Sequence, residues 1–422
     1  MRKAAVPILP ASSIDAAVAL LSTLLLYYAA LIIYSTKFST LSKDPGPWFP
    51  ASTSLWIRWH RWQGNLAFTA DRLLSRYGPV VRISPSMVVV NDSPALQAVF
   101  TRHDLDTAPR DIRALRVGGH LWTIAIPELS IARERRRAIM GATITRALKY
   151  WHPVFEDNVN KMIATLGESG GKRAQDIVHV ARRTVFQNAQ MVVAGSKSEI
   201  DPGVFAGVVG NFNFLVVWRL ILPAWAVKWL KYSPFKHVRA HLQADGDLFQ
   251  FGHTVYEKAQ EKTTGNHKGA ATVIDALKLA AIFWPRPPAA FTASRLAPKG
   301  GINMLGYQIP EGTIIATQSL SMSRQRPGIF PDYDTYDPTR WLNKEGLSER
   351  RKCVVPFGIG ARRCPGSNMA LYQLRLVVTG VVKAFKITVA PESSTPDKVR
   401  LYEANGFRCG PKDECFLLFQ PR

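Results

Sequence analysis

One cysteine stands where it could serve as a metal ligand. Residues 356–366 read PFGIGARRCPG, so a glycine-interrupted loop places Cys364 directly before an apolar stretch that predicts a helix. The N–H groups at the start of that helix, together with Arg362 and Arg363, favour the thiolate form of the sulfur. This combination predicts a thiolate site for a transition metal.

The glycines of this loop suit a flat ligand. Gly358 and Gly360 lack a Cβ, so their backbone can pass close to such a ligand and leave N–H groups free to bond the sulfur, which tunes the metal. Thiolate ligation of haem iron favours O–O cleavage. The other cysteines, Cys353, Cys409 and Cys415, form no CxxC pair, so neither a zinc site nor a thioredoxin-type motif is predicted. They are interpreted as free thiols, with a Cys409–Cys415 disulfide as the alternative.

The cysteine segment resembles the haem-binding loop of cytochrome P450 enzymes, whose pattern is Phe-x-x-Gly-x-Arg-x-Cys-x-Gly. The positions that match are Phe357, Gly360, Arg362, Cys364 and Gly366. The resemblance implies that Cys364 binds haem iron and that Arg362 pairs with a haem propionate. It also implies that Phe357 packs beside the sulfur.

Other stretches resemble the same family. They are the segment that ends Pro-x-Arg-Trp, a hairpin and the first β-sheet, at residues 330–341, 306–312 and 76–91. The resemblance implies two further propionate ligands, Arg295 and Arg136, although a solvated basic face is the alternative for Arg136. It covers residues 45–262 and 286–422, and it is strongest to the fungal, microsomal, membrane-anchored members.

Residues 269–285, GAATVIDALKLAAIFWP, depart from the family. Here its members have a long oxygen-groove helix with a threonine kink and a helix that carries Glu-x-x-Arg. Asp275 and Lys278 come nearest to the second motif, but lysine cannot make the bidentate contact that arginine makes. We therefore interpret the region near 269–286 as a deletion, natural or introduced by faulty exon assembly.

The order of patterns along the chain predicts the fold class. Extended runs at 76–85 and 86–91 precede mostly helical patterns, including one at 131–148, up to residue 262. Short β-like runs follow residue 285, and a last helix at 368–385 leads into terminal strands. These patterns predict a mainly α fold with a smaller β subdomain. The resemblance implies an incomplete cytochrome P450-like fold.

The N-terminal region predicts a membrane anchor. Residues 16–34 are uncharged, and nineteen helical residues at 1.5 Å each span roughly 30 Å of hydrocarbon. A signal peptide and a buried core helix are the alternatives. The segment DPGPWFP then predicts a stiff, extended connector. The organisation we predict is a tail, a transmembrane anchor, a Pro-rich connector and a haem-thiolate domain, at residues 1–15, 16–34, 35–51 and 52–422.

Charge and composition limit the partners. The chain has 47% apolar and 20% charged residues and a formal net charge of +23. Such a charge suits nucleic acid, anionic lipid or an acidic protein, but no nucleic-acid reading motif accompanies it. We therefore expect no nucleic-acid partner, and favour a membrane surface or an acidic electron donor.

The function implied by the resemblance is a haem-dependent monooxygenase. It would insert one oxygen atom of O2 into a small apolar organic substrate, in fungal secondary metabolism or xenobiotic conversion. An NADPH-cytochrome P450 reductase-type protein would supply the electrons. The implied location is the endoplasmic reticulum, with the catalytic domain on the cytosolic side. The alternatives are a haem-binding but catalytically impaired membrane protein and a basic membrane-surface scaffold without haem.

Overall fold

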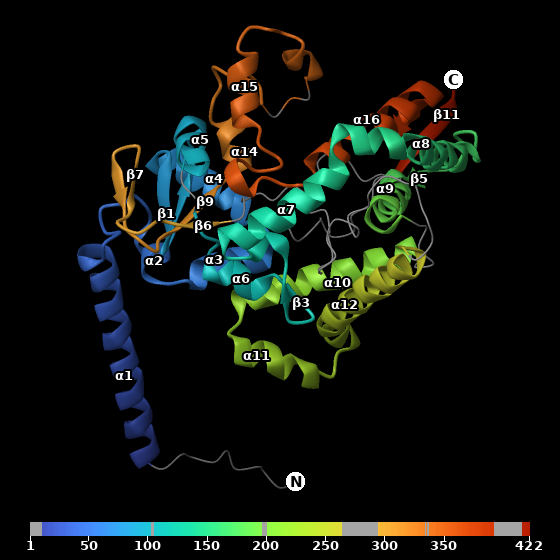
Figure 1. Ribbon diagram of the computed structural model, residues 1–422. Coiled ribbons are helices and arrows are strands. Elements are labelled where there is room, and N and C mark those ends of the chain that lie inside the picture. The colour runs from blue at the N-terminus through green and yellow to red at the C-terminus, as the bar shows by residue number, and fades with distance from the viewer. Residues whose placement is uncertain are drawn as a thin grey trace, which may run out of the picture.

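A computed structural model describes residues 11–102, 105–195, 201–263, 294–333, 335, 337–391 and 416–422. Helices make up most of the described chain, and the strands form small sheets (Figure 1). The helices of its first half are α1 (Ala11–Ile33), η1 (Tyr34–Phe38), α2 (Trp48–Ser52), α3 (Leu55–Gln63), α4 (Leu66–Tyr77), α5 (Ser93–Arg102), α6 (Pro109–Ala114), η2 (Thr123–Ala125), α7 (Leu129–Thr143), α8 (Thr145–Gly167) and α9 (Ile177–Ala194).

The remaining helices are α10 (Pro202–Ile221), α11 (Ala224–Trp229), η3 (Leu230–Tyr232), α12 (Lys236–Thr263), α14 (Ser319–Arg324), η4 (Pro338–Trp341), α15 (Leu347–Cys353), η5 (Gly360–Arg362) and α16 (Ser367–Ala384). The strands are β1 (Val80–Ser84), β2 (Met87–Val90), β3 (Arg116–Val117), β4 (His120–Leu121), β5 (Gln175–Asp176), β6 (Arg295–Leu296), β7 (Ile302–Met304), β8 (Tyr307–Ile309), β9 (Ile314–Thr317), β10 (Phe385–Val389) and β11 (Phe416–Pro421). This confirms the predicted fold class, mainly α with a smaller β part.

The largest sheet joins distant parts of the chain in the order β1-β2-β9-β6. Strands β1 and β2 pair antiparallel, β2 pairs parallel with β9, and Arg295 of β6 pairs with Ile315 of β9. The strands predicted near residues 76–91 and the hairpin near residue 306, formed by β7 and β8, are confirmed. Both faces of β1 and β2 are buried, which explains their near-continuous valine and isoleucine runs.

A buried arginine attaches the N-terminal helix to this sheet. The Arg82 side chain is only 2% exposed. It donates to the carbonyl oxygens of Ser35 and Leu41 at 2.8 and 3.1 Å, and to those of Ser84 and Pro85 at 3.3 and 2.9 Å. One guanidinium therefore holds the end of the N-terminal helical segment against β1.

The connector differs from the extended form that we predicted. Residues Trp48–Ser52 form helix α2, which contacts β1 and the N-terminal helical segment. Pro47 supplies the extended N-cap, and Pro50 falls in the first turn, where a missing N–H breaks no helical hydrogen bond. Burial of Pro50, Ala51 and Ser52 stabilises this short helix.

The helical part centres on α8 and α16. The helix predicted at 131–148 is two helices, because Ile144 takes an extended conformation (ψ 157°) between α7 and α8. The final helix, predicted at 368–385, is confirmed as α16. It packs on α8, and the strands that follow it form a sheet in the order β10-β11-β5. A second helical layer pairs α10 with α12.

Within the described residues, two helices are long and apolar enough to cross a membrane. One covers Val18–Phe38 and is almost fully exposed; the other, Pro202–Ile221, packs partly in the core. The first overlaps the predicted anchor at residues 16–34, whose place in a membrane stays a prediction. Asp275, Lys278, Cys409, Cys415 and the region of the predicted deletion lie outside the described residues.

Candidate functional site

The loop before α16 is a closed turn that carries Cys364. The Cys364 N–H donates to the Phe357 carbonyl at 2.8 Å, and the Arg363 N–H donates to the Gly360 carbonyl at 3.1 Å. Gly358 and Gly360 have φ values of +70° and +69°, which glycine adopts without strain. The sequence therefore fixes a turn that places the sulfur at the start of α16, as predicted.

The two glycines serve different purposes. A Cβ on Gly360 would lie 1.9 Å from the Phe100 carbonyl oxygen of α5, so no side chain fits there. A Cβ on Gly358 would meet no atom within 4 Å. Gly360 thus allows close packing of the turn on α5, while the space beside Gly358 is open. Their roles toward a ligand stay predictions.

Arg362 ties the turn to the segment that leads into α7. Its side chain is only 7% exposed. It donates to the carbonyls of Ile126 and Pro127 at 2.6 and 2.7 Å. At the other end of α7, the Thr143 hydroxyl donates to the Pro365 carbonyl at 3.0 Å. Both ends of α7 are therefore bonded to the cysteine loop.

This arrangement brings three predicted site residues together. Arg136 of α7 lies close enough to Cys364 and Arg362 for both to shift its pKa. Burial lowers the pKa of the Arg136 guanidinium, the sulfur raises it and the neighbouring guanidinium lowers it. Arg136 is thus partly buried beside the cysteine loop, and the choice between a propionate ligand and a solvated basic face stays a prediction. No carboxylate is among the charged groups that shift these pKa values within the described part of the chain.

The surroundings of Cys364 act on the pKa of its thiol in two opposite directions. Burial raises the pKa of the thiol above its usual value of 9.0. A hydrogen bond from the Gly366 N–H and the charges of Arg136 and Arg363 lower it, but burial is the largest effect. The prediction did not include this desolvation, so the thiolate of Cys364 stays a prediction that depends on the bound metal. Metal binding would have to displace the proton.

Arg295, a predicted propionate ligand, and Arg340, the arginine of the Pro-x-Arg-Trp segment, lie in other elements. Arg295 is buried in β6, where its Nη1 donates to the Ser294 carbonyl at 3.1 Å. Arg340, in the segment that resembles the family's meander, donates to the carbonyls of Asp337, Asp332 and Thr335. These contacts place Arg295 in the sheet and do not by themselves join it to Cys364.

Sequence reasoning missed Trp122. Its ring stacks on Phe212 with centroids 5.3 Å apart, and it directly precedes η2. The buried indole Nε1 has no hydrogen-bond acceptor among the described residues. A buried N–H without an acceptor is costly, so this donor is available to a bound polar group. The only signal in the sequence is a tryptophan a few residues before a helix.

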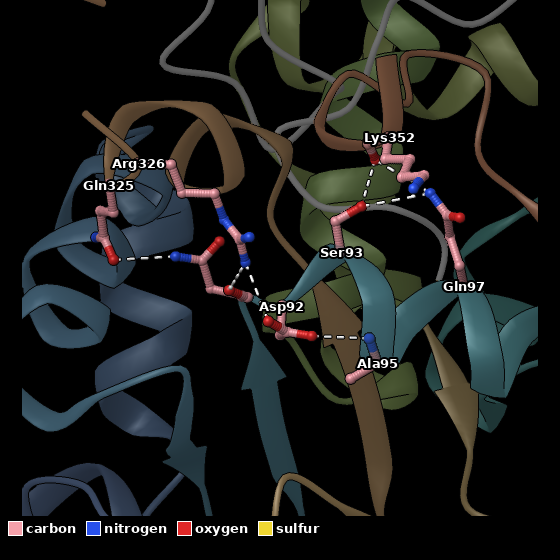
Figure 2. A network of polar contacts seen from close by, with 8 residues as sticks. Asp92, Ser93, Ala95, Gln97, Gln325, Arg326 and Lys352 are labelled. Atoms are coloured by element: carbon pink, nitrogen blue, oxygen red, sulfur yellow. Dashed lines mark hydrogen bonds and ion pairs between the residues drawn. The ribbon is translucent and has the colours of Figure 1, made fainter. Parts of the chain in front are cut away.

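A polar network holds α5 against the elements that lead into the cysteine loop (Figure 2). Arg326 donates to the Asp92 carboxylate at 3.1 Å, and Asp92 accepts the Ala95 N–H at 2.7 Å as the N-cap of α5. The Ser93 hydroxyl and the Gln97 amide both donate to the Lys352 carbonyl. Together with the Gly360 contact, these bonds fix the loop against α5.

A groove of about 520 Å³ lies between α5, α15 and the cysteine loop. It is lined by Gln97, Leu347, Ser348, Arg351, Lys352, Val355 and Ile359. Its charged lining residues are both cationic, so it suits a negatively charged partner.

Comparison with known proteins decides the family. Residues 286–412 match the cytochrome P450 family. Cytochrome P450 monooxygenase orf2 of Aspergillus niger is 22% identical over 93% of each chain, and cytochrome P450 monooxygenase stcB of Emericella nidulans is 22% identical over 80% of this chain and 81% of that protein. The chain belongs to the cytochrome P450 family. The retinoic acid-bound cyanobacterial CYP120A1 has the same fold, with a TM-score of 0.57 at 17% identity, covering 90% of this P450 and 99% of that chain.

The residues of this P450 fit haem, which the family normally binds. A haem brings one iron and two propionates. The loop offers one thiol, and Arg136 and Arg362 lie together beside it with no carboxylate among the neighbours that shift the pKa of Arg136. Arg362 is buried and Arg136 is partly buried, so two positive charges lie beside the thiol, and a bound anion would lower the repulsion between them. The donor set therefore matches the charge of the group.

Proposed function

We propose that this chain is a haem-thiolate monooxygenase that inserts one oxygen atom of O2 into a small apolar organic substrate. The observation that carries the proposal is the meeting of Cys364, Arg136 and Arg362 at one end of α16. The fungal relatives named as cytochrome P450 monooxygenases support the same reaction class. When bound, the haem supplies the binding and activation of oxygen.

The chain's own residues would hold and orient that group. Cys364 binds the iron as a thiolate, and the Gly366 N–H withdraws charge from the sulfur through its hydrogen bond. Arg362 and Arg136 bind the propionates, while the Ile126 and Pro127 carbonyls keep the Arg362 guanidinium in place. Phe357 would pack beside the sulfur, and Arg295 is proposed as a further propionate ligand.

A second candidate is a haem-binding protein that does not turn over. Residues 264–293 hold neither a threonine kink nor Glu-x-x-Arg. The alignment with the Aspergillus niger relative spans 476 residues, more than the 422 of this chain, so it opens gaps in this chain. This supports a deletion, and loss of a helix over the haem would admit water and disturb proton delivery.

The proposed partners follow from charge and from the N-terminal helix. The basic groove beside the cysteine loop, with Arg351 and Lys352, is the proposed docking place of an acidic NADPH-cytochrome P450 reductase-type donor. Helix α1 is the proposed transmembrane anchor, with the domain on the cytosolic face of the endoplasmic reticulum.

Spectroscopy of the reduced, CO-treated protein tests the proposal. We expect the strongly red-shifted band that a haem thiolate gives, and we expect Cys364→Ser to abolish it. Cys353→Ser, which changes a buried cysteine outside the turn, is the matched control and should retain the band. An unchanged spectrum in Cys364→Ser would refute the ligand assignment.

Turnover separates the two candidates. Oxidation of an apolar substrate with the reductase, or with peroxide as the oxidant, supports the monooxygenase. A red-shifted band without either activity supports the impaired protein. The absence of haem binding would leave the membrane-surface scaffold.

A further inference from the structure

Two histidines lie one helical turn apart at the start of α12. His237 and His241 are four residues apart, so their side chains share one face of the helix, and their ring centroids are 6.1 Å apart. The His237 side chain is exposed, and His241 is partly buried. Two histidines at this spacing are the metal-binding part of the zinc motif His-Glu-x-x-His. Val238 replaces the glutamate of that motif, so the pair offers metal ligands without the general base.

The neighbouring helix fixes the orientation of the His241 ring. Helix α12 packs along α10 (Figure 1), and the His241 Nδ1 donates to the Asn211 Oδ1 of α10 at 2.9 Å. The same ring stacks on Phe214, with centroids 4.7 Å apart, and meets the Trp218 ring edge-on at 5.0 Å. Because Nδ1 carries the bonded hydrogen, Nε2 keeps its lone pair for a ligand. Histidines that bind metals are oriented in this way, by a hydrogen bond from the second ring nitrogen.

The surroundings of His241 favour the neutral imidazole, which is the form that binds a metal. Burial lowers the pKa of the His241 imidazole below its usual value of 6.5, and the charge of His237 lowers it further. Among the described residues, no lysine or arginine contributes to this shift of the pKa. Arg239, two residues before His241, donates instead to the carbonyls of Ser233 and Pro234 at 2.7 and 3.0 Å. Its charge is therefore held at the start of α12.

The pair supplies two ligands and leaves the other positions of an ion to water. In the part of the chain that the structure describes, no group of three or more His, Cys, Asp or Glu side chains could hold a metal. Asp245 lies one turn beyond His241, but its carboxylate pairs with Arg219 at 3.3 Å. Two imidazoles on one tetrahedral ion have ring centroids roughly 5 Å apart, a distance that rotation of the exposed His237 side chain would reach. Lys236 and the positive end of the helix dipole oppose a cation, so we expect weaker binding than in a closed zinc site.

We propose that His237 and His241 form a surface site that binds one divalent first-row transition metal ion, with water in the remaining positions. Imidazole suits copper, nickel and zinc, and the order of affinities for such a nitrogen site places copper first. The site is separate from the proposed haem site, because α12 carries none of the residues assigned to haem. A bound ion would join His237 to His241, and the Asn211 hydrogen bond would then hold the first turns of α12 against α10.

Titration with Cu²⁺ tests the site in the full-length protein, prepared in detergent without a polyhistidine tag. Pulsed EPR then counts the imidazoles that bind the copper ion. We expect two in the native chain and one in His237→Ala or His241→Gln, with the affinity for Cu²⁺ lowered about tenfold or more. Asn211→Ala should keep both imidazoles and lower the affinity by about tenfold, because it removes the bond that orients His241. The matched control is His253→Ala, which changes a histidine paired with Glu257 further along α12 and should alter neither result.

Thermal unfolding with Ni²⁺ gives an independent measurement. The ion should raise the unfolding midpoint of the native chain and of His253→Ala, but not of His237→Ala, because a ligand that binds only the folded state stabilises it. His237 is exposed, so His237→Ala should fold as the native chain does, which circular dichroism checks. An equal imidazole count in the native chain and His237→Ala would refute the site, and so would a count that falls only in His253→Ala. The absence of saturable Cu²⁺ binding to the native chain would refute it as well.

Discussion

Two buried arginines join distant segments of this P450, and they differ in how their charge is balanced. Arg82 donates to four carbonyls and has the Asp44 carboxylate beside it. Arg362 donates to two carbonyls and lies beside a second cation, Arg136. The first is a completed structural contact. At the second, positive charge accumulates next to a thiol.

This difference teaches that burial of an arginine does not by itself reveal its role. Where carbonyls and an acid surround the guanidinium, the protein itself balances the charge. Where a second guanidinium is a neighbour, as at Arg362, a bound anion would lower the repulsion between the two charges. The four predictions below test this contrast.

The largest effect on folding is expected from Arg82→Ala. The change removes four hydrogen bonds and leaves buried carbonyls without donors, which costs roughly 3 kcal/mol or more in the free energy of unfolding. Thermal unfolding in detergent, with and without haem, measures it, and Arg76→Ala at an exposed position of α4 is the control. Equal loss in the control would show that the Arg82 contacts contribute nothing.

For Arg362→Ala we expect a smaller loss of folding stability than for Arg82→Ala, and a larger loss of haem affinity. Without haem, its two lost hydrogen bonds cost about 1–2 kcal/mol, partly offset by relief of repulsion with Arg136. The affinity for haem should fall about tenfold or more, as for other residues that support a metal site. Haem titration and unfolding are measured on the same sample. A loss of stability as large as in Arg82→Ala, with unchanged haem affinity, would contradict the contrast.

Arg136→Ala tests the contribution of the Arg136 positive charge to haem binding. This change should leave the haem-free protein unchanged or slightly more stable, because it removes one of two adjacent cations. The affinity for haem should fall roughly five- to tenfold, equivalent to about 1 kcal/mol. Arg137→Ala, on the exposed face of the same helix, is the matched control. Destabilisation of the haem-free protein would show that Arg136 is balanced without a ligand.

The smallest effect concerns Asp44. Burial raises its pKa from 3.8 to about 6, against the opposing effect of Arg82. The folded state therefore holds this proton more tightly than the unfolded state. The stabilisation of the folded state by the protonated Asp44 carboxyl is complete below about pH 4 and is lost as the pH rises through about 6. Asp44→Asn should then gain about 1 kcal/mol over the native chain at pH 7.5, after allowance for solvent screening, and little at pH 4. Equal differences at both pH values would contradict the shift.

The sequence was most informative where local patterns agree with tertiary contacts. The apolar runs before Asn91 became β1 and β2. The apolar run after Cys364 became α16, whose bounds differ by one residue from those predicted. A motif located the cysteine turn, because its glycines and cysteine are neighbours in the chain.

Other features depend on contacts that no local pattern encodes. Strand β5, Gln175–Asp176, has two residues and no alternation, and it forms only because β11 offers it an edge. The break at Ile144 ends α7 where Thr143 bonds to Pro365, more than two hundred residues away. Burial raised the pKa of Cys364, and no reading of neighbouring residues could supply that burial.

The hydrogen bonds at both ends of α7 link the position of the Cys364 sulfur to the position of this helix. Arg362 is hydrogen-bonded to the segment before this helix, and Thr143 is hydrogen-bonded to Pro365. These bonds link α7, which crosses the middle of the molecule, to the cysteine loop at two points (Figure 1). A push on the solvent side of α7, by a substitution at Ile131 or Met140 or by a docked protein, would be transmitted to the Cys364 turn. The absorption spectrum of haem bound as proposed would then change when the outer face of α7 is perturbed.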